Sequence, residues 1–316
     1  MSKVVHRKKR LSSFKLIVLG FAAVIFVGAL LLMLPVSSVS GTQTPFHEAL
    51  FTSVSAVCVT GLVVQDTGSY WSSFGQAVIL LLIQTGGLGV ITVAVSFAIL
   101  SGRKISLMQR STMQDAISAP KIGGIVRLTK FSVQGTLFIE LLGMTAMLPV
   151  FFHDYGIKGI WMAAFHSVSA FCNAGFDILG CEKPDNSLIG YANDPLVCIP
   201  VALLIIVGGL GFIVIHNIYY AKLFPSLKKK KRLPLNLHSR VAICMTVALL
   251  VIGTVGFLAF EWNNTLEGKN FFQKLLVSFF QSTSARTAGF ASVDIASEHD
   301  ITKLLTVILM FIGAAP

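Results

Sequence analysis

The stretch that decides the fold is FTSVSAVCVTG, residues 51–61, because three versions of it occur in the chain. It aligns without gaps on FHSVSAFCNAG at 165–175 and on FFQSTSARTAG at 279–289, and both steps are 114 residues long. Each version is a short apolar segment with a glycine at its end. Three copies at equal spacing indicate an internal repeat, not chance similarity among apolar segments.

The sequence on either side of these segments repeats as well. MLPV at 33–36 recurs at 147–150, and GGLG at 86–89 recurs at 208–211, with Gly313 as the third equivalent. Each repeat is therefore expected to be a long apolar helix, a short segment ending in a glycine turn, and a second apolar helix. The copies run in the same direction, which predicts rotational symmetry about the membrane normal and not an inverted repeat.

The composition places these repeats in a membrane. The chain has 316 residues, of which 54% are apolar and only 12% are charged, against about 25% charged in soluble domains. This excludes a soluble enzyme, a disordered protein and a nucleic-acid-binding domain, despite the net charge of +11. The five cysteines have no metal-ligand spacing and an odd count, which is a poor disulfide framework.

Six apolar runs are candidates for membrane spans, which need about 20 residues. They are 16–36, 75–100, 131–152, 195–221, 240–260 and 304–316. The first is a retained helix, because Met33-Leu34-Pro35 is no cleavage site for a signal peptidase. The shorter runs 46–57, 161–172 and 271–284 are predicted to be re-entrant, with interfacial helices or loops as the alternative.

Charge predicts the orientation of these spans. The N-terminal arm, the loop 101–130 and the loop 222–240 hold 19 of the 25 Lys and Arg residues. The positive-inside rule therefore places the N-terminus and both loops in the cytoplasm. Twelve of the 14 acidic residues fall on the opposite side, where they either attract cations or form ordinary solvated loops. The run Lys228–Arg232 is predicted to contact anionic lipid headgroups.

The glycine turns are the candidate site. Non-helical backbone at membrane depth must be buried in protein or line a wet cavity, and its carbonyl groups can replace the hydration shell of an ion. Glycine allows the positive φ that such turns need, and the C-terminal ends of the short helices favour a cation. The predicted ion-binding filter residues are Val59, Thr60, Gly61, Asn173, Ala174, Gly175, Thr287, Ala288 and Gly289. The predicted supporting residues are Cys58, Leu62, Cys172, Phe176, Arg286 and Phe290.

Two of the filter side chains have open alternatives. The hydroxyl of Thr60 and the amide of Asn173 either face the ion path or pack behind their loops.

The three turns VTGL at 59–62, NAGF at 173–176 and RTAGF at 286–290 resemble the first three filter loops of the Trk/Ktr/HKT superfamily of cation transporters. The resemblance covers nearly the whole chain and is strongest to the KtrB membrane subunits, because no extra helices precede the first span. It implies an all-α integral membrane fold of parallel helix–pore loop–helix repeats with potassium-channel-like pseudo-fourfold symmetry. Glycine at position 61 implies potassium as the transported ion.

The resemblance also implies partners and a longer chain. It implies a homodimer in a bacterial plasma membrane, with a cytoplasmic nucleotide-binding regulatory subunit of the KtrA type. Residues 1–100 are assigned to repeat 1, 101–222 to repeat 2 with its leading cytoplasmic loop, and 223–316 to a basic loop and an incomplete repeat 3. A fourth repeat, expected from the family, is missing. We therefore expect this sequence to be a fragment, without the family's gating loop and last-helix arginine.

Several polar residues inside the predicted spans need partners. Glu140 is expected to be a structural or protonated hydrogen-bonded group rather than an ion-coupling one. Arg286 is expected to point behind its loop, where carboxylates or carbonyls can hold it, with Glu48 as a candidate partner. His166, which aligns with Thr52, is expected to pack behind a short helix.

Cys58 and Cys172 are expected to be small buried residues. The glycine clusters are expected to allow close helix contacts rather than to act as hinges. Gln84, Thr85, His216 and Asn217 are candidates for facing a wet cavity.

Three alternative functions compete with potassium transport. A sodium-preferring or sodium/potassium-cotransporting member of the same superfamily is the nearest. A secondary transporter for organic solutes is disfavoured by the parallel repeats. An intramembrane enzyme is disfavoured because Glu140 is the only acidic residue in the predicted spans. No cofactor is expected besides the transported ion, and no nucleic acid.

Overall fold

The computed structural model describes residues 13–101, 107–117, 125–181, 187–219 and 235–314. Within these ranges the protein is helical and contains no strand beyond an isolated bridge between Ser38 and Trp71. The α-helices are α1 Ser13–Leu32, α2 Phe46–Val57, α3 Ser73–Leu88, α4 Val90–Leu100, α5 Leu107–Ile117, α6 Ile125–Tyr155, α7 Ile157–Phe171, α8 Pro195–Leu210, α9 Phe212–Ile218, α10 Leu237–Phe260, α11 Phe271–Ser284 and α12 Asp300–Ile312. Short 3₁₀ turns occur at Pro35–Ser37, Leu179–Cys181, Ile189–Tyr191 and Ile295–Ser297.

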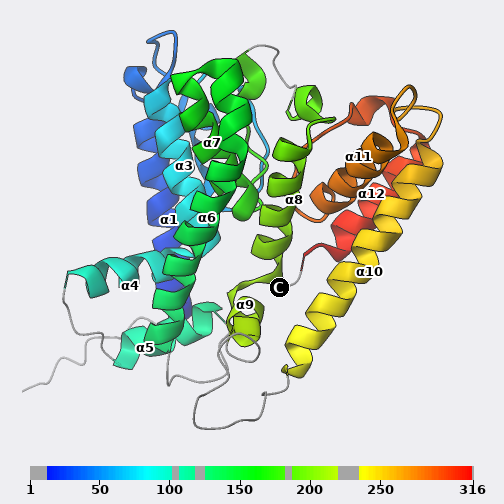
Figure 1. Ribbon diagram of the computed structural model, residues 1–316. Helices are drawn as coiled ribbons and strands as arrows, with labels where there is room; N and C mark the ends of the chain where they lie inside the picture. The colour runs from blue at the N-terminus through cyan, green and yellow to red at the C-terminus, as the bar shows by residue number, and fades with distance from the viewer. Residues whose placement is uncertain (1–12, 102–106, 118–124, 182–186, 220–234, 315–316) are drawn as a thin grey trace, which may run out of the picture.

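Nine of the twelve described α-helices form three trios in chain order. The first trio is α1, α2 and α3, the second is α6, α7 and α8, and the third is α10, α11 and α12. Within each trio the first helix packs on the second and third, and Figure 1 shows the third trio, in yellow to red, beside α8. The short apolar segments predicted at 46–57, 161–172 and 271–284 are indeed short helices, α2, α7 and α11.

Two predicted spans are not continuous helices. The run 75–100 breaks between α3 and α4 with a bend of 99°, and the run 195–221 breaks between α8 and α9 with a bend of 95°. The break residues are Gly89 and Gly211, with φ of +82° and +76°. The sequence analysis did not predict these bends. They arise because the glycine at the end of each GGLG motif takes a backbone conformation that terminates a helix.

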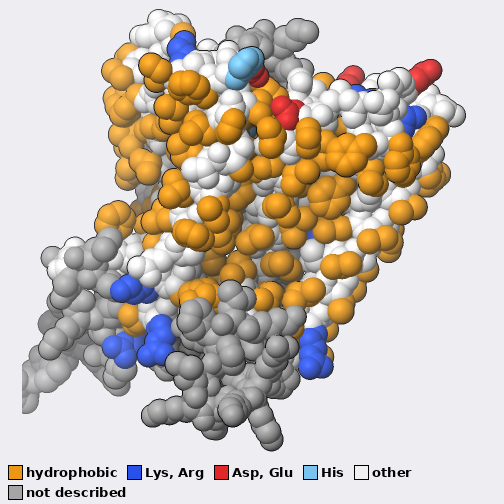
Figure 2. Space-filling model, viewed as in Figure 1, with side chains coloured by type: hydrophobic (Ala, Val, Ile, Leu, Met, Phe, Trp, Pro, Cys, Tyr) orange, Lys and Arg blue, Asp and Glu red, His pale blue; other side chains and the backbone are white. Residues whose placement is uncertain are grey.

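Among the described residues, the three helices α1, α6 and α10 are long and apolar enough to cross a membrane, and the number rises to five if each bent pair is one span. The sixth predicted span corresponds to α12, which has 13 residues. Figure 2 shows a broad band of apolar side chains on the visible face, with most of the visible Lys and Arg at the lower end and the visible Asp and Glu near the upper end. The region Lys228–Arg232 lies outside the described residues.

In every trio the short helix and the first helix make the same contact, which small residues allow. In each, a serine of the short helix donates a hydrogen bond to a carbonyl of the first helix: Ser53 Oγ to Ile25 O at 2.7 Å, Ser167 Oγ to Glu140 O at 2.5 Å, and Ser282 Oγ to Leu250 O at 3.1 Å. Three residues after each carbonyl lies a glycine whose missing side chain leaves room for that serine and for a leucine of the third helix; they are Gly28, Gly143 and Gly253. This contact holds the short helix at an equivalent level along the first helix in every trio.

Candidate functional site

The three glycine turns have the same backbone shape. A residue with positive φ lies two residues after the end of α2 and of α7 and three residues after the end of α11. The glycine two residues further on also has positive φ. The first residues are Val59, Asn173 and Thr287, with φ of 54°, 55° and 73°. The glycines are Gly61, Gly175 and Gly289, with φ of 78°, 71° and 81°. Residues other than glycine rarely adopt this region, and β-branched ones least of all.

The three turns come together in space. A side chain placed on Gly61 would collide with the carbonyl oxygen of Ala174, and one on Gly175 would lie 2.6 Å from that of Ala288. A Cβ on Gly289 would lie 3.4 Å from the Cα of Gly175. Segments 114 residues apart in the sequence therefore touch through backbone atoms, at a spacing that only glycine allows.

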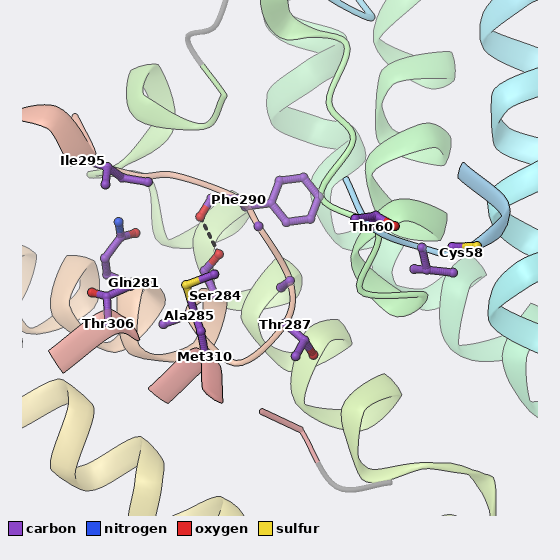
Figure 3. A pocket seen from close by; sticks show the side chains of 13 residues that line it. Cys58, Thr60, Gln281, Ser284, Ala285, Thr287, Phe290, Ile295, Thr306 and Met310 are labelled. Atoms are coloured by element: carbon purple, nitrogen blue, oxygen red, sulfur yellow. Dashed lines mark hydrogen bonds between the residues drawn. The ribbon is translucent and has the colours of Figure 1, made fainter. Parts of the chain in front are cut away.

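A cavity of about 440 Å³ lies beside the first and third turns. Its wall includes Cys58, Val59 and Thr60 from the first turn, and Thr287, Ala288 and Gly289 from the third. Figure 3 shows the third turn running between Thr60 and the α12 residues Thr306 and Met310. The second turn is absent from the wall of this cavity.

The supporting residues divide into two groups. Phe176 and Phe290, which follow the glycines of the second and third turns, are 1% and 2% exposed, whereas Leu62 in the first turn is 59% exposed. Ala174 and Ala288 are buried, and Thr60 is exposed. Cys172 is half-buried and its thiol points to Gln84 Oε1 at 3.8 Å. Cys58 is exposed, which corrects the expectation of a buried residue, because it lies on the cavity wall.

Asn173 packs behind its loop. With the amide oriented so that its nitrogen donates, Nδ2 lies 3.0 Å from Ala170 O and 3.2 Å from Ile205 O. The second contact ties the turn to α8. Of the two alternatives for this amide, the geometry favours support of the loop over direct contact with an ion.

Arg286 points away from the cavity but not toward Glu48. Its Nε donates to Gly313 O at 3.3 Å and its Nη2 to Thr246 Oγ1 at 3.3 Å, and it is 6% exposed. Glu48 instead accepts a hydrogen bond from Gln65. The predicted Arg286–Glu48 pair is therefore wrong, because Arg286 faces α10 and the end of α12 within its own trio.

Glu140 is buried in α6, where Gln84 Nε2 of α3 donates to its carboxyl group at 3.2 Å. This contact joins the first two trios and agrees with the structural, hydrogen-bonded role predicted for Glu140. His166 is fully buried, with Nδ1 2.8 Å from Met162 O and its ring against Phe151, as expected of a packing residue.

The other polar candidates also contact helices. Asn217 donates to Ser239 and Thr85 donates to Leu81 O, and His216 packs edge-on against Phe131. None of Gln84, Thr85, His216 and Asn217 is in the wall of the cavity. Within the described ranges, no group of three His, Cys, Asp or Glu side chains could hold a metal ion.

The glycine clusters lie against the ends of the short helices. A side chain on Gly86 would collide with Val57 O, and one on Gly208 with Phe171 O. The predicted role in close helix contact is thus confirmed for these glycines. The last glycine of each cluster has a second role that the sequence analysis did not predict, since it is where the helix bends.

Sequence reasoning missed the serines of the short helices. Ser169 Oγ donates to Phe176 O at 2.6 Å, and Ser284 Oγ donates to Phe290 O. The ungapped alignment hid this equivalence, because it pairs Ser169 with Thr283 and Ser167 with Gln281. The hydrogen bonds show that α11 is shifted by one residue relative to its glycine. The recurring Ser-x-Ser spacing was the available signal.

Apolar helices of membrane-crossing length, with glycine turns gathered beside a cavity, define the class of integral membrane transport proteins. Residues 11–316 match the TrkH family of cation transport proteins. The chain belongs to this family, whose members are transporters and not enzymes.

Known relatives agree with this assignment. The chain is 40% identical over 308 residues to the potassium/sodium uptake protein NtpJ of Enterococcus hirae, covering 97% of this chain and 65% of the relative. It is 38% identical to the Ktr system potassium uptake protein B of Bacillus subtilis, covering 95% of this chain and 65% of the relative. The chain thus spans about 65% of the length of these relatives.

A solved structure has the same fold. The crystal structure of the potassium transporter TrkH from Vibrio parahaemolyticus matches with a TM-score of 0.67 and 19% identity, over 98% of this chain and 58% of that chain.

Proposed function

We propose that the chain forms the larger part of a potassium uptake protein, in which the three glycine turns form three sides of a selectivity filter. The observation that carries the proposal is the contact among the turns: Gly61, Gly175 and Gly289 bring three backbone segments together through gaps that exclude side chains. Carbonyl-lined turns at such a meeting point can replace water around a cation.

The repeat pattern extends this proposal to the architecture. The trios correspond to helix–pore loop–helix repeats within 1–100, 101–222 and 223–316, arranged about one axis as three parts of a pseudo-fourfold pore. The ends of α2, α7 and α11 face the turns with their negative dipole ends, which favours a cation there. An open flank of this arrangement would account for the cavity beside the first and third turns.

The relatives and the charge distribution support a proposal about the partners and the membrane orientation of the protein. Relatives named as Ktr system proteins support a complex with a cytoplasmic nucleotide-binding regulatory subunit and a homodimer of the membrane subunit. The excess of Lys and Arg in the N-terminal arm and in the loops 101–130 and 222–240 supports a cytoplasmic N-terminus in a bacterial plasma membrane.

Sodium is the competing ion. It is favoured by the 40% identity to a protein named for potassium and sodium uptake. Potassium is our first choice because all three turns have glycine at the central position, and glycine there goes with potassium conduction in the resembling family. Both choices place the ion at the same turns.

The proposal is tested by potassium rescue. The whole reading frame that contains this chain is expressed, with its partner subunit, in a bacterium that lacks potassium uptake systems, and growth is titrated against potassium. We expect growth at low potassium, and we expect Gly61→Ser to weaken it strongly, because position 61 has φ of +78° and no room for a side chain.

Gly41→Ser is the matched control. Gly41 also has positive φ, at +68°, but a side chain there meets nothing within 4 Å. It therefore introduces the same kind of backbone strain away from the turns, and we expect it to leave rescue intact. A well-expressed protein that never rescues growth would overturn the potassium assignment. Uptake of radioactive sodium by the same cells would then test the competing ion.

A further inference from the structure

A serine hydroxyl near the end of the short helix makes a hydrogen bond to the turn in the second and third repeats but not in the first. Ser169 and Ser284 each reach across their own turn to the carbonyl of the phenylalanine that follows the glycine; Figure 3 shows the second of these hydrogen bonds. The equivalent residue in the first turn is Ser55. Its hydroxyl is buried and, among the described residues, has no hydrogen-bond partner.

The phenylalanine rings strengthen this difference. Phe176 and Phe290 are buried, so both turns are held at the same residue by a hydrogen bond and by an apolar anchor. Leu62, at the same place in the first turn, is exposed and has neither. Backbone hydrogen bonds to the end of the short helix are common to all three turns: Thr60 N to Ser55 O and Ala174 N to Ser169 O at 2.8 Å, and Ala288 N to Ser284 O at 3.0 Å. The first turn therefore differs from the others only in lacking the serine hydrogen bond and the buried ring.

The carbonyl group that accepts the serine hydrogen bond belongs to the residue directly after the glycine. Fixing its peptide plane restricts the rotation of the glycine backbone, and hence the direction of the glycine carbonyl. Glycine has no side chain to restrict it, so an external hydrogen bond is an effective restraint. Because selectivity among cations depends on how firmly and where carbonyl groups are held, a restraint at this point bears on ion choice.

We infer that Ser169 and Ser284 are positioning residues that set the ion discrimination of the second and third turns, whereas Ser55 has no such role. The inference rests on the proposed function, since it assigns the turns to an ion path. Ser169 and Ser284 touch the backbone of the turns and not the ion, so they act through Phe176 and Phe290.

The test compares three alanine variants of the whole protein. Ser169→Ala, Ser284→Ala and the matched control Ser55→Ala each remove one buried hydroxyl from the same position of a short helix. At equal amounts of protein in the membrane, the ratio of potassium to sodium uptake is measured with radioactive rubidium, as the potassium probe, and with sodium. We expect the ratio to fall roughly threefold to tenfold in the first two variants, the size expected from loss of one hydrogen bond, and to stay at the wild-type value in the third.

Conservative variants separate positioning from folding. Ser284 borders the cavity, so Ser284→Thr has room for a methyl group, and Ser169→Cys keeps a donor of similar size; both are expected to keep more of the discrimination than alanine. Equal ratios in all three alanine variants would overturn the inference. Absence of uptake by the wild-type protein would instead count against the proposed function, and these two failures are therefore distinct.

Discussion

At the scale of single residues, the turns combine one predictable feature with one that was hidden. The glycines stand out in the sequence because they recur in register, and their positive φ follows from that role. The left-handed residues before them do not stand out, since Val59, Asn173 and Thr287 share no side-chain chemistry. Only Asn is at ease in this region; the β-branched Val and Thr are strained there.

Thr287→Asn tests this strain. Thr287 is exposed and has φ of 73°, so asparagine relieves the backbone without loss of buried contacts. A strained residue costs roughly 1–3 kcal/mol, and we expect a gain of about 1 kcal/mol, or a rise of about 2 °C in melting temperature. Thermal unfolding of the detergent-solubilised protein gives the answer. The reverse exchange, Asn173→Thr, should lower the melting temperature, and a rise in that variant would contradict the explanation.

Two buried carboxyl groups on the predicted outer side have opposite pKa shifts. Burial raises the pKa of Glu298, a change that its hydrogen bond from Gln281 only partly offsets. Burial also acts to raise the pKa of Glu261, but hydrogen bonds from Thr302, His299, Thr265 and Asn264 outweigh it and leave that pKa lowered. Ionisation of Glu298 therefore opposes folding, and ionisation of Glu261 supports it.

Glu298→Gln and Glu261→Gln should accordingly change the melting temperature in opposite directions. At pH 8 the first variant should melt higher than wild type, and the difference should shrink as the pH falls toward 4.5, where the carboxyl group becomes protonated in both states. The second should melt lower, by an amount equivalent to about 2 kcal/mol, and its difference should shrink only as the pH falls below 4.5. Melting curves between pH 2.5 and 8 measure both; a gap that stays constant over this whole range in either variant would refute the assigned cause.

At the scale of helices, the repeating apolar runs in the sequence predicted where the helices lie, but they did not predict the contacts between helices. The three short helices lie where the apolar runs place them. The bends at Gly89 and Gly211 were missed because an apolar run looks the same whether it is straight or broken. Carbonyl groups were among the expected partners of Arg286, but the choice of Glu48 was wrong because Arg286 faces the carbonyl of Gly313 and the hydroxyl of Thr246 in its own trio.

The contact of α8 with the end of α7 is an element-scale prediction. Gly208→Ala would drive a methyl group into the carbonyl of Phe171, and backbone atoms on both sides leave little room to relax. Overpacking of this kind costs roughly 1–3 kcal/mol, so we expect a lower melting temperature. Gly135→Ala in α6 is the control, because a side chain there meets nothing within 4 Å. It should raise stability by roughly 0.5–1 kcal/mol through helix propensity alone.

At the scale of the whole molecule, the apolar lengths of the long helices can be compared with the thickness of a membrane. In α6 the apolar stretch between Lys130 and His153 has 22 residues, or about 33 Å at 1.5 Å per residue. In α10 the stretch between Arg240 and Glu261 has 20 residues, or about 30 Å. Both match a hydrocarbon core of about 30 Å. α6 begins near Lys130 and ends at His153 and Asp154, and α10 begins near Arg240 and ends at Glu261. Because each has a basic residue near its start and a carboxylate at its end, we expect both to cross the membrane in the same direction.

This common direction leads to the last prediction, that the basic end is cytoplasmic. Single cysteines are introduced by Arg110→Cys in α5 and Asp300→Cys at the start of α12, two exposed positions at opposite ends, in a protein whose five native cysteines are replaced. A membrane-impermeant maleimide should label intact cells through position 300 and not through position 110. Both should be labelled after permeabilisation, which controls for reactivity. The reverse pattern would place the acidic end in the cytoplasm, and the charge bias of the loops would then not set the orientation.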